Sequence, residues 1–191
     1  MGKLKIIIMK KIATFVFIVI YSFSYSQDQT SKKVQLGVSY SLTNNNEIFK
    51  NPLSFNVNYQ VKKWNNLDLN VGIGAFYFIS NVKETFSNKF SFNPNIGSTY
   101  NFNNSKFSSY IKLGYYYDNF KFNPTNFGLI TNPNIDIKSN GIIITSGLMY
   151  FIQENIFIDS NLNLLFSTTK NASFYTESSN TFFNFGLGVA F

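Results

Sequence analysis

Apolar and polar residues alternate along most of the chain from Lys33 to its end. In residues 181–191 an apolar face (Phe183, Phe185, Leu187, Val189 and Phe191) alternates with a small or polar face (Asn184, Gly186, Gly188 and Ala190). A period of two places successive side chains on opposite faces of a β-strand. This stretch is therefore predicted to be an amphipathic strand that ends on an aromatic residue.

Seven earlier stretches repeat the pattern, at residues 34–42, 53–62, 67–77, 90–102, 107–117, 142–150 and 156–166. Pro94 lacks a backbone N–H, so a bulge or local break is expected there. The connections after the second, fourth and sixth stretches are short, and the others are longer, the longest being about 118–140. Short periplasmic turns and longer outer loops are typical of outer-membrane barrels. The sequence therefore predicts an all-β, eight-stranded, antiparallel up-and-down transmembrane β-barrel.

Alternation alone does not say which face is outside, because a soluble lipocalin-like barrel turns its apolar face inward. Three features favour an apolar exterior. The polar face is mostly Asn, Ser, Gly and Thr, and only 13% of all residues are charged, which is few for a water-exposed surface. Strands of about ten residues can cross a bilayer when tilted. Aromatic residues also gather near both strand ends, as in the two interfacial girdles of membrane barrels.

The first residues have the features of a secretory signal peptide. Lys10 and Lys11 precede an apolar run, 12–21, and Ser24 and Ser26 provide small residues before a cleavage site. We expect a cleaved signal peptide at 1–26 and the outer-membrane barrel domain at 27–191. The sequence leaves open whether translation starts at Met1 or Met9.

Net charge does not indicate a nucleic-acid partner. The formal charge is +7, but four lysines lie in the N-terminal segment, and the remaining 12 lysines are spread among 9 acidic residues. The chain has no arginine for base readout and no cysteine for disulfides or thiolate metal sites. No cofactor, metal or nucleic acid is expected.

The chain resembles the OmpA/OmpX-type eight-stranded outer-membrane barrels. The resemblance rests on the expected signal peptide, the eight amphipathic strands, the connections that alternate between short and long, and the terminal Phe191. The asparagine-rich, arginine-free composition is similar to outer-membrane β-barrel proteins of Bacteroidota. The resemblance implies a location in the cell outer membrane, contact with its lipid, and insertion by the barrel-assembly machinery. That machinery would read the last strand, with Phe191, Val189 and Leu187 as its signal. The family includes adhesion, resistance, assembly and secretion-associated proteins, so the resemblance does not define one function.

Catalytic chemistry finds little support in the sequence. The chain has no histidine, which excludes Ser–His and Asp–His arrangements, and we expect no enzyme activity. The alternation places Lys62, Asp68, Lys112 and Asp159 on the inward face. Unpaired charges in a narrow lumen are costly, so we expect a polar network in which Lys112 and Asp159 meet across the lumen. An internal plug is favoured over an ion path.

Partner binding is expected at the long loops. The 118–140 stretch contains apolar residues that either form a contact surface or pack on the barrel rim, among them Phe120, Phe122, Phe127, Leu129 and Ile130. The favoured function is a structural or interaction barrel that contacts an unidentified extracellular or envelope partner. The alternative is a narrow conduit or a transport- or secretion-associated barrel.

Deletion of Phe191 tests the terminal signal. We expect the deletion to impair assembly into the outer membrane more than refolding of the purified barrel in detergent. Cell fractionation and the gel-mobility shift between unheated and boiled samples measure the two effects. Equal defects in both assays would mean that Phe191 contributes to packing alone.

Overall fold

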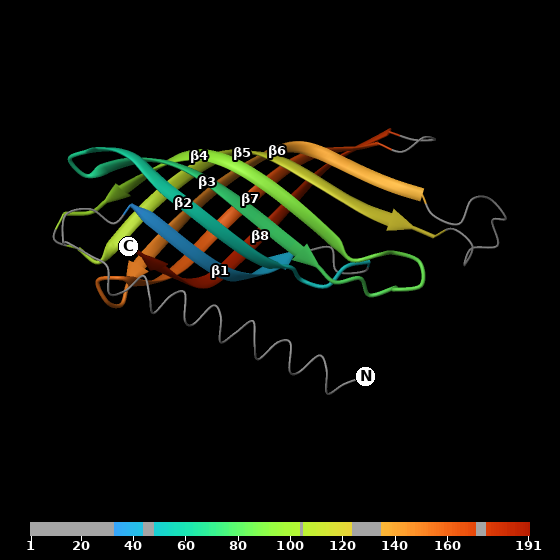
Figure 1. Cartoon of the computed structure of the whole chain (residues 1–191), viewed down its shortest axis with the longest axis horizontal. Helices are drawn as coiled ribbons and strands as arrows, with labels where there is room; N and C mark the ends of the chain where they lie inside the picture. Colours follow the sequence, from blue (N-terminus) through green and yellow to red (C-terminus); the bar gives the residue numbers. More distant parts are fainter. Residues whose placement is uncertain (1–32, 44–47, 104, 124–134, 171–174) are drawn as a thin grey trace, which may run out of the picture.

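The computed structural model describes residues 33–43, 48–103, 105–123, 135–170 and 175–191. Its strands are β1 (Val34–Thr43), β2 (Leu53–Trp64), β3 (Leu67–Phe78), β4 (Lys89–Asn101), β5 (Phe107–Phe122), β6 (Ile135–Phe151), β7 (Ile156–Lys170) and β8 (Tyr175–Ala190). Each strand pairs with its sequence neighbours, and β1 pairs with β8, so the antiparallel sheet is a closed barrel (Figure 1). The predicted fold class is confirmed. The expected signal peptide, 1–26, lies outside the described residues.

The barrel has two distinct ends. The turn end, at the left in Figure 1, carries the β2–β3, β4–β5 and β6–β7 connections and the C-terminus. The loop end carries the other connections. At the turn end, Asn65 and Asn66 form the β2–β3 hairpin, and Asn65 has a φ of 51°, a backbone conformation that asparagine tolerates better than most residues.

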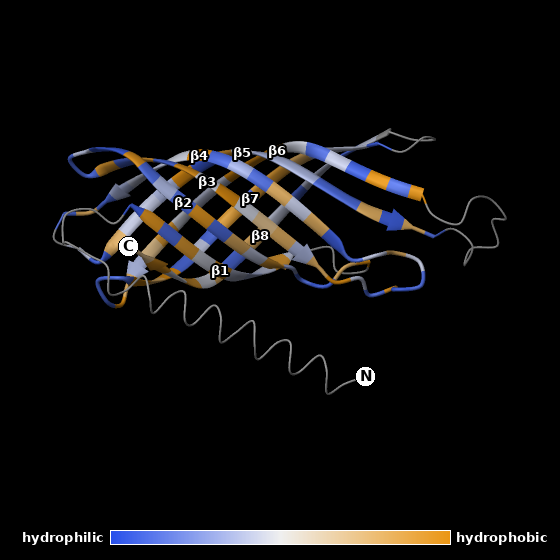
Figure 2. Ribbon diagram, viewed as in Figure 1, coloured by the Kyte–Doolittle hydropathy of each residue, from blue (hydrophilic) through white to orange (hydrophobic). Residues whose placement is uncertain are grey.

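The polarity of the two faces is that of a membrane barrel. Outward residues such as Leu113 (54% exposed) and Leu187 (59%) are apolar, whereas inward Ser91 (0%) and Asn184 (2%) are buried and polar. Hydrophobic and hydrophilic bands accordingly alternate along each strand in Figure 2. The lipocalin-like arrangement is thus excluded. The described residues contain no helix long and apolar enough to cross a membrane.

The last residue completes the closure of the barrel. Val34 and Phe191 exchange two backbone hydrogen bonds, with N–O distances of 2.9 and 2.8 Å. The side chain of Phe191 is buried, unlike that of Leu187 on the same predicted face. The sequence placed Phe191 on the open apolar face with Leu187, and the structure corrects that placement.

Two irregularities interrupt the ladders. Between β4 and β5 the register runs to Phe92↔Tyr117 and resumes at Asn95↔Gly114, so the expected local break at Pro94 is present without a change of register. A second irregularity was not predicted. The β2–β3 register shifts between Gln60 and Lys62, and such a bulge turns the following side chains relative to the regular alternation.

Four strands extend further towards the loop end than the alternation predicted. The stretch 118–140 was expected to be a loop, but Asp118 pairs with Ser139 and the ladder continues to Phe122↔Ile135. Only 123–134 connect β5 to β6, and 124–134, with Phe127, Leu129 and Ile130, lie outside the described residues. Likewise β7 and β8 remain paired up to Lys170 and Tyr175. The strands of the β5–β8 wall therefore extend further at the loop end than β1 to β4 do (Figure 1).

The outward face of the extended segments is polar, unlike the outward face of the rest of the barrel. On β5 the outward side chains change from Tyr115 and Tyr117 to Asn119 and Lys121, while Phe120 points inward and is only half-buried. The same change occurs on the three following strands, where the outward and exposed residues are Asp136, Lys138 and Asn140 on β6, Lys170 on β7, and Glu177, Ser179 and Thr181 on β8. A strand with a polar outer face suits water rather than lipid. The edge of the hydrocarbon layer nearer the loop end therefore lies between Tyr117 and Asn119 on β5.

Paired substitutions on one face of β5 test this boundary. Leu113→Lys places a charge in the middle of the apolar band and should destabilise the barrel by about 2–4 kcal/mol. Asn119→Lys, on the same face above the boundary, should change stability by less than about 1 kcal/mol. Reversible urea unfolding in lipid vesicles measures both values. Similar losses for the two variants would place Asn119 within the lipid layer.

Candidate functional site

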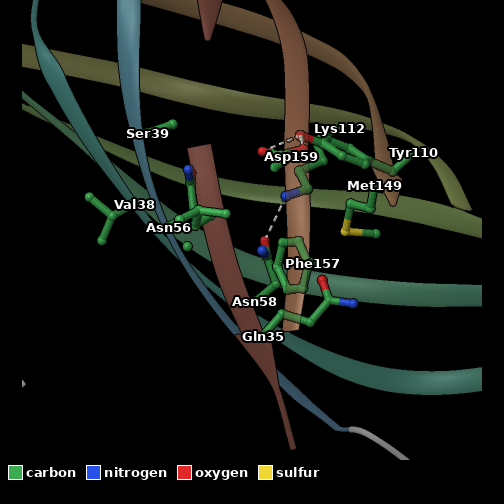
Figure 3. A pocket seen from close by; sticks show the side chains of 12 residues that line it. Gln35, Val38, Ser39, Asn56, Asn58, Tyr110, Lys112, Met149, Phe157 and Asp159 are labelled. Atoms are coloured by element: carbon green, nitrogen blue, oxygen red, sulfur yellow. Dashed lines mark hydrogen bonds between the residues drawn. The ribbon is translucent and has the colours of Figure 1, made fainter. Parts of the chain in front are cut away.

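The central lumen brings Lys112 and Asp159 into one cluster. The Tyr110 hydroxyl donates to both oxygens of Asp159, at 2.8 and 3.1 Å, and Asn161 Nδ2 donates to Oδ2 at 2.7 Å. Lys112 Nζ donates to Asn58 Oδ1 at 2.9 Å and lies 4.5 Å from the centre of the Tyr110 ring (Figure 3). In the described structure the two charged groups form no direct ion pair. Tyr110 lies between them and contacts both.

Amide side chains extend this cluster along the lumen towards the loop end. Asn163 and Asn184 both donate to Asn161 Oδ1, at 2.9 and 2.8 Å, and the Thr145 hydroxyl donates to Asn163 Oδ1. Each asparagine offers both donors and an acceptor. The chain of amides therefore ends on the Asp159 carboxylate and supplies part of its solvation.

The other two predicted lumen residues lie elsewhere. Asp68 is inside the barrel at the turn end, where Gln60 Nε2 and Asn101 Nδ2 donate to its two oxygens at 2.6 and 2.7 Å. Lys62 is not in the lumen. The β2 bulge pairs it with Leu69, on the outward face, and its Nζ lies 4.6 Å from the centre of the Trp64 ring. A lysine beside an exposed tryptophan suits the membrane interface.

Apolar side chains close the lumen towards the loop end. Phe76 and Phe78 of β3 contact Phe182 of β8, with ring centroids 5.8 and 6.2 Å apart. Because β3 and β8 are not adjacent strands, these rings meet across the lumen. Tyr116, Ile143 and Leu165 complete this buried cluster.

Towards the turn end, a second apolar cluster contains Tyr110, Met149, Phe157 and Ala190. Glycines make room for its rings. A Cβ at Gly188 would lie 2.2 Å from the Phe157 ring, and one at Gly147 would lie 2.6 Å from the Tyr110 ring. The rings of Tyr110 and Phe157 thus explain the glycines at 147 and 188.

The space left around the charged cluster is small. A cavity of about 20 Å³ lies beside Lys112 and Asp159, which is room for about one water molecule. Such a space is a site for internal hydration. It does not provide a continuous aqueous pore, since an apolar layer lies above it.

In the part of the chain that the structure describes, no group of three or more His, Cys, Asp or Glu side chains is placed to hold a metal ion. The carboxylates of Asp68 and Asp159 bind separate sets of donors, so they do not form an acid–base pair.

The rim contains a charged pair that the sequence did not predict. Asp118 points into the barrel and is 1% exposed, with Lys89 Nζ 2.9 Å from its Oδ2. Phe120, assigned to a loop, packs inward against Phe49 with ring centroids 5.4 Å apart, so packing on the barrel rim is the alternative that holds for this residue. The inward alternation of Tyr116, Asp118 and Phe120 was the available signal, but the polar outward residues between them made the stretch look irregular.

The connections at the rim are tied to the barrel. Phe49 bridges to Ser80, joining the β1–β2 and β3–β4 connections. Phe86 bridges to Phe122, and Ser87 N donates to Lys121 O at 2.9 Å, which holds the β3–β4 connection against β5. The described part of the rim is therefore an ordered surface.

The fold is shared with known outer-membrane proteins. No protein-family model matches the sequence, and no curated protein matches it. The N-terminal β-barrel domain of OprF from Pseudomonas aeruginosa is similar in structure, with a TM-score of 0.61 and 12% identity, covering 85% of this chain and 100% of that one. Ail, the attachment invasion locus protein of Yersinia pestis, gives a TM-score of 0.53 at 18% identity, covering 83% and 97%.

Neisserial surface protein A, NspA, gives a TM-score of 0.51 at 14% identity and covers 83% of this chain and 96% of its own. At these identities the likeness establishes the fold. The chain has the eight-stranded barrel of small outer-membrane proteins, in agreement with the predicted OmpA/OmpX-type architecture and outer-membrane location.

Two double-mutant cycles test the organisation of the lumen. Tyr110→Phe and Asp159→Asn should be coupled by about 1.5–3 kcal/mol, because the first removes the donor of one hydrogen bond and the second removes the charge that strengthens it. Lys112→Met and Asp159→Asn should show weaker coupling, since no direct ion pair joins those side chains. Unfolding free energies in lipid vesicles provide both values. Stronger coupling in the lysine cycle would mean that Lys112 is the principal partner of Asp159.

Proposed function

We propose that the protein is a small non-enzymatic outer-membrane β-barrel with a structural or binding role, exercised through its extracellular end. The single observation that carries this proposal is the contrast between the filled lumen and the polar outer face of the β5–β8 wall at the loop end. The lumen is filled by side chains, whereas the β5–β8 wall extends beyond the lipid layer as an ordered, polar surface. A closed interior leaves the outer rim as the surface on which a partner acts.

The extended wall has the composition of a contact surface in water. Its outward side chains include Lys121 and Lys138 together with Asp136 and Glu177. Charges of both signs on a fixed scaffold favour specific contact with a polar or charged partner. One protein of the same fold, Ail, has been solved in complex with the heparin analogue sucrose octasulfate, and this complex supports the proposal of a binding role.

The route to this location follows from the sequence. In the proposal, residues 1–26 direct export and are removed, and residues 27–191 form the mature barrel. The barrel-assembly machinery would recognise the last strand through Phe191, Val189 and Leu187. The β1–β8 pairing, from Gln35↔Ala190 to Thr43↔Phe182, is the closure that this step must produce.

A conductance measurement distinguishes the proposed role from the alternative function, a narrow conduit. In planar bilayers the purified barrel should pass essentially no steady current, because rings from β3 and β8 meet across the lumen. The double variant Phe76→Ala and Phe182→Ala removes that contact and is compared with the wild-type barrel in the same measurement. A steady current through the wild-type barrel would favour the conduit.

Site-specific photo-cross-linking in intact cells tests the binding role. A photoreactive amino acid at Lys138, on the outward face of the extended wall, should capture a discrete partner. The same group at Lys106, exposed at the turn end, is the matched control and should not capture it. Capture from Lys106 alone would move the binding surface to the periplasmic side, and absence of capture from Lys138 and from Asp136 would argue for a purely structural role.

A further inference from the structure

A second, larger cavity lies at the loop end of the lumen, above the apolar layer. Its volume is about 200 Å³, which is below the range of about 300–1,000 Å³ for drug-sized ligand sites. Two of its lining residues, Ile48 and Ser178, are exposed, so the cavity reaches the surface of the rim. The space suits a ligand of one small ring.

One wall of the cavity is aromatic. Phe49 lies edge-on to Phe78 and to Phe120, with ring centroids 6.1 and 5.4 Å apart, and Phe182 contacts Phe78 from the other side at 6.2 Å. These rings come from β3, β5, β8 and the β1–β2 connection, so their positions are fixed by four separate segments. The wall offers ring faces and edges to the C–H groups of a ligand.

The opposite wall carries hydroxyl groups from β6, β7 and β8. Ser139 and Thr169 share a hydrogen bond of 2.9 Å, and Ser167 and Ser178 share one of 3.1 Å. Each hydroxyl has one donor and two acceptor positions, so these pairs keep acceptor capacity for a further partner. Asn180 adds an amide to the same wall.

A charged pair lies between the two walls. Lys89 Nζ is 2.9 Å from Asp118 Oδ2 and lies 4.5, 5.5 and 5.7 Å from the ring centres of Phe78, Phe49 and Phe120. Tyr116 also donates its hydroxyl to Oδ2. Among the described residues, Asp118 Oδ1 is buried and accepts no hydrogen bond. A buried carboxylate oxygen without a donor is costly, and it lies on a residue that lines the cavity.

The aromatic, hydroxyl and charged groups that line the cavity favour one class of ligand over the others. An alkyl chain would leave Asp118 Oδ1 without a donor and would cover the hydroxyl wall. An anion would face that carboxylate, while Lys89 is already engaged with it. An organic cation fits an aromatic cage, but the Lys89 ammonium lies among the same rings. A neutral ring with several hydroxyls can donate to Oδ1, bond to the serine and threonine hydroxyls, and place its C–H face on the phenylalanines.

We propose that this cavity is a binding site for a neutral sugar, one hexose ring in size, with Asp118 as the principal acceptor and Phe120 as part of the stacking wall. The site is distinct from the macromolecular contact on the outward face of the β5–β8 wall and does not depend on it. A sugar carried by a larger glycan would enter by its terminal ring, since the cavity has room for one.

Ligand-detected saturation-transfer NMR tests the site. The full barrel in lipid nanodiscs is mixed in turn with D-glucose, D-galactose, D-mannose and N-acetyl-D-glucosamine, and empty nanodiscs correct for lipid binding. At least one sugar should give a signal with the wild-type barrel. Asp118→Asn and Phe120→Ala should each weaken that binding about tenfold or more. Asp68→Asn, which changes a carboxylate at the turn end, should leave it unchanged.

Further probes separate the other ligand classes. Tetramethylammonium, inorganic phosphate and cyclohexanol represent a cation, an anion and an apolar ring. The gel-mobility shift on heating confirms that each variant is folded, and Phe120→Ala leaves the Lys89–Asp118 pair in place if Asp118→Asn fails to fold. Absence of a signal from all four sugars would overturn the proposal. So would sugar binding that survives in Phe120→Ala, or preferential binding of one of the three other probes.

Discussion

A closed barrel of eight strands in lipid forces every strand residue into one of two environments. One face meets hydrocarbon, which cannot supply hydrogen bonds, and the other meets a lumen just wide enough for its own side chains. The outward face can therefore be filled with almost any apolar residue. The inward face has to satisfy its polar groups with one another, in a space that admits little water. Most features of this molecule follow from that difference.

The lumen meets the requirement by complementing large side chains with small ones. Aromatic rings lie opposite glycines, as with Phe157 and Gly188, and asparagines form a hydrogen-bonded chain that ends on Asp159. The carboxylate needs donors more than it needs a formal counter-charge, and a tyrosine and an amide provide them. Asp68 follows the same rule with Gln60 and Asn101. An interior built in this way is a filled core between its two apolar clusters.

The sequence was sufficient for the strand number, the pairing order and the identity of the lipid-facing side, because lipid imposes a strict alternation that can be counted. It was insufficient where another constraint replaced that alternation. The bulge at Gln60–Lys62 moved Lys62 from the lumen to the interface, and a one-residue insertion in a ladder has no separate signature in composition. Above the lipid layer, β5 keeps its period but its outward face becomes polar while an inward residue, Phe120, is apolar, so Asp118 and Phe120 looked like loop residues. The route from Lys112 through Tyr110 to Asp159 depends on side-chain directions across the lumen, which a register alone does not define.

The unequal height of the wall has a mechanical consequence. The β5–β6 ladder runs from Phe107↔Tyr150 to Phe122↔Ile135 without a register shift, so the segment that stands in water is continuous with the segment held in lipid. A tensile load applied to the paired end of this hairpin, along the strand direction, pulls β5 and β6 together and shears their ladders with β4 and β7, whose hydrogen bonds share the load in parallel. The load passes directly into the membrane-embedded strands, with no hinge among the described residues of the two strands. A cell-surface attachment made at this rim would therefore be stiff, and its yield point would be set by the barrel rather than by a linker.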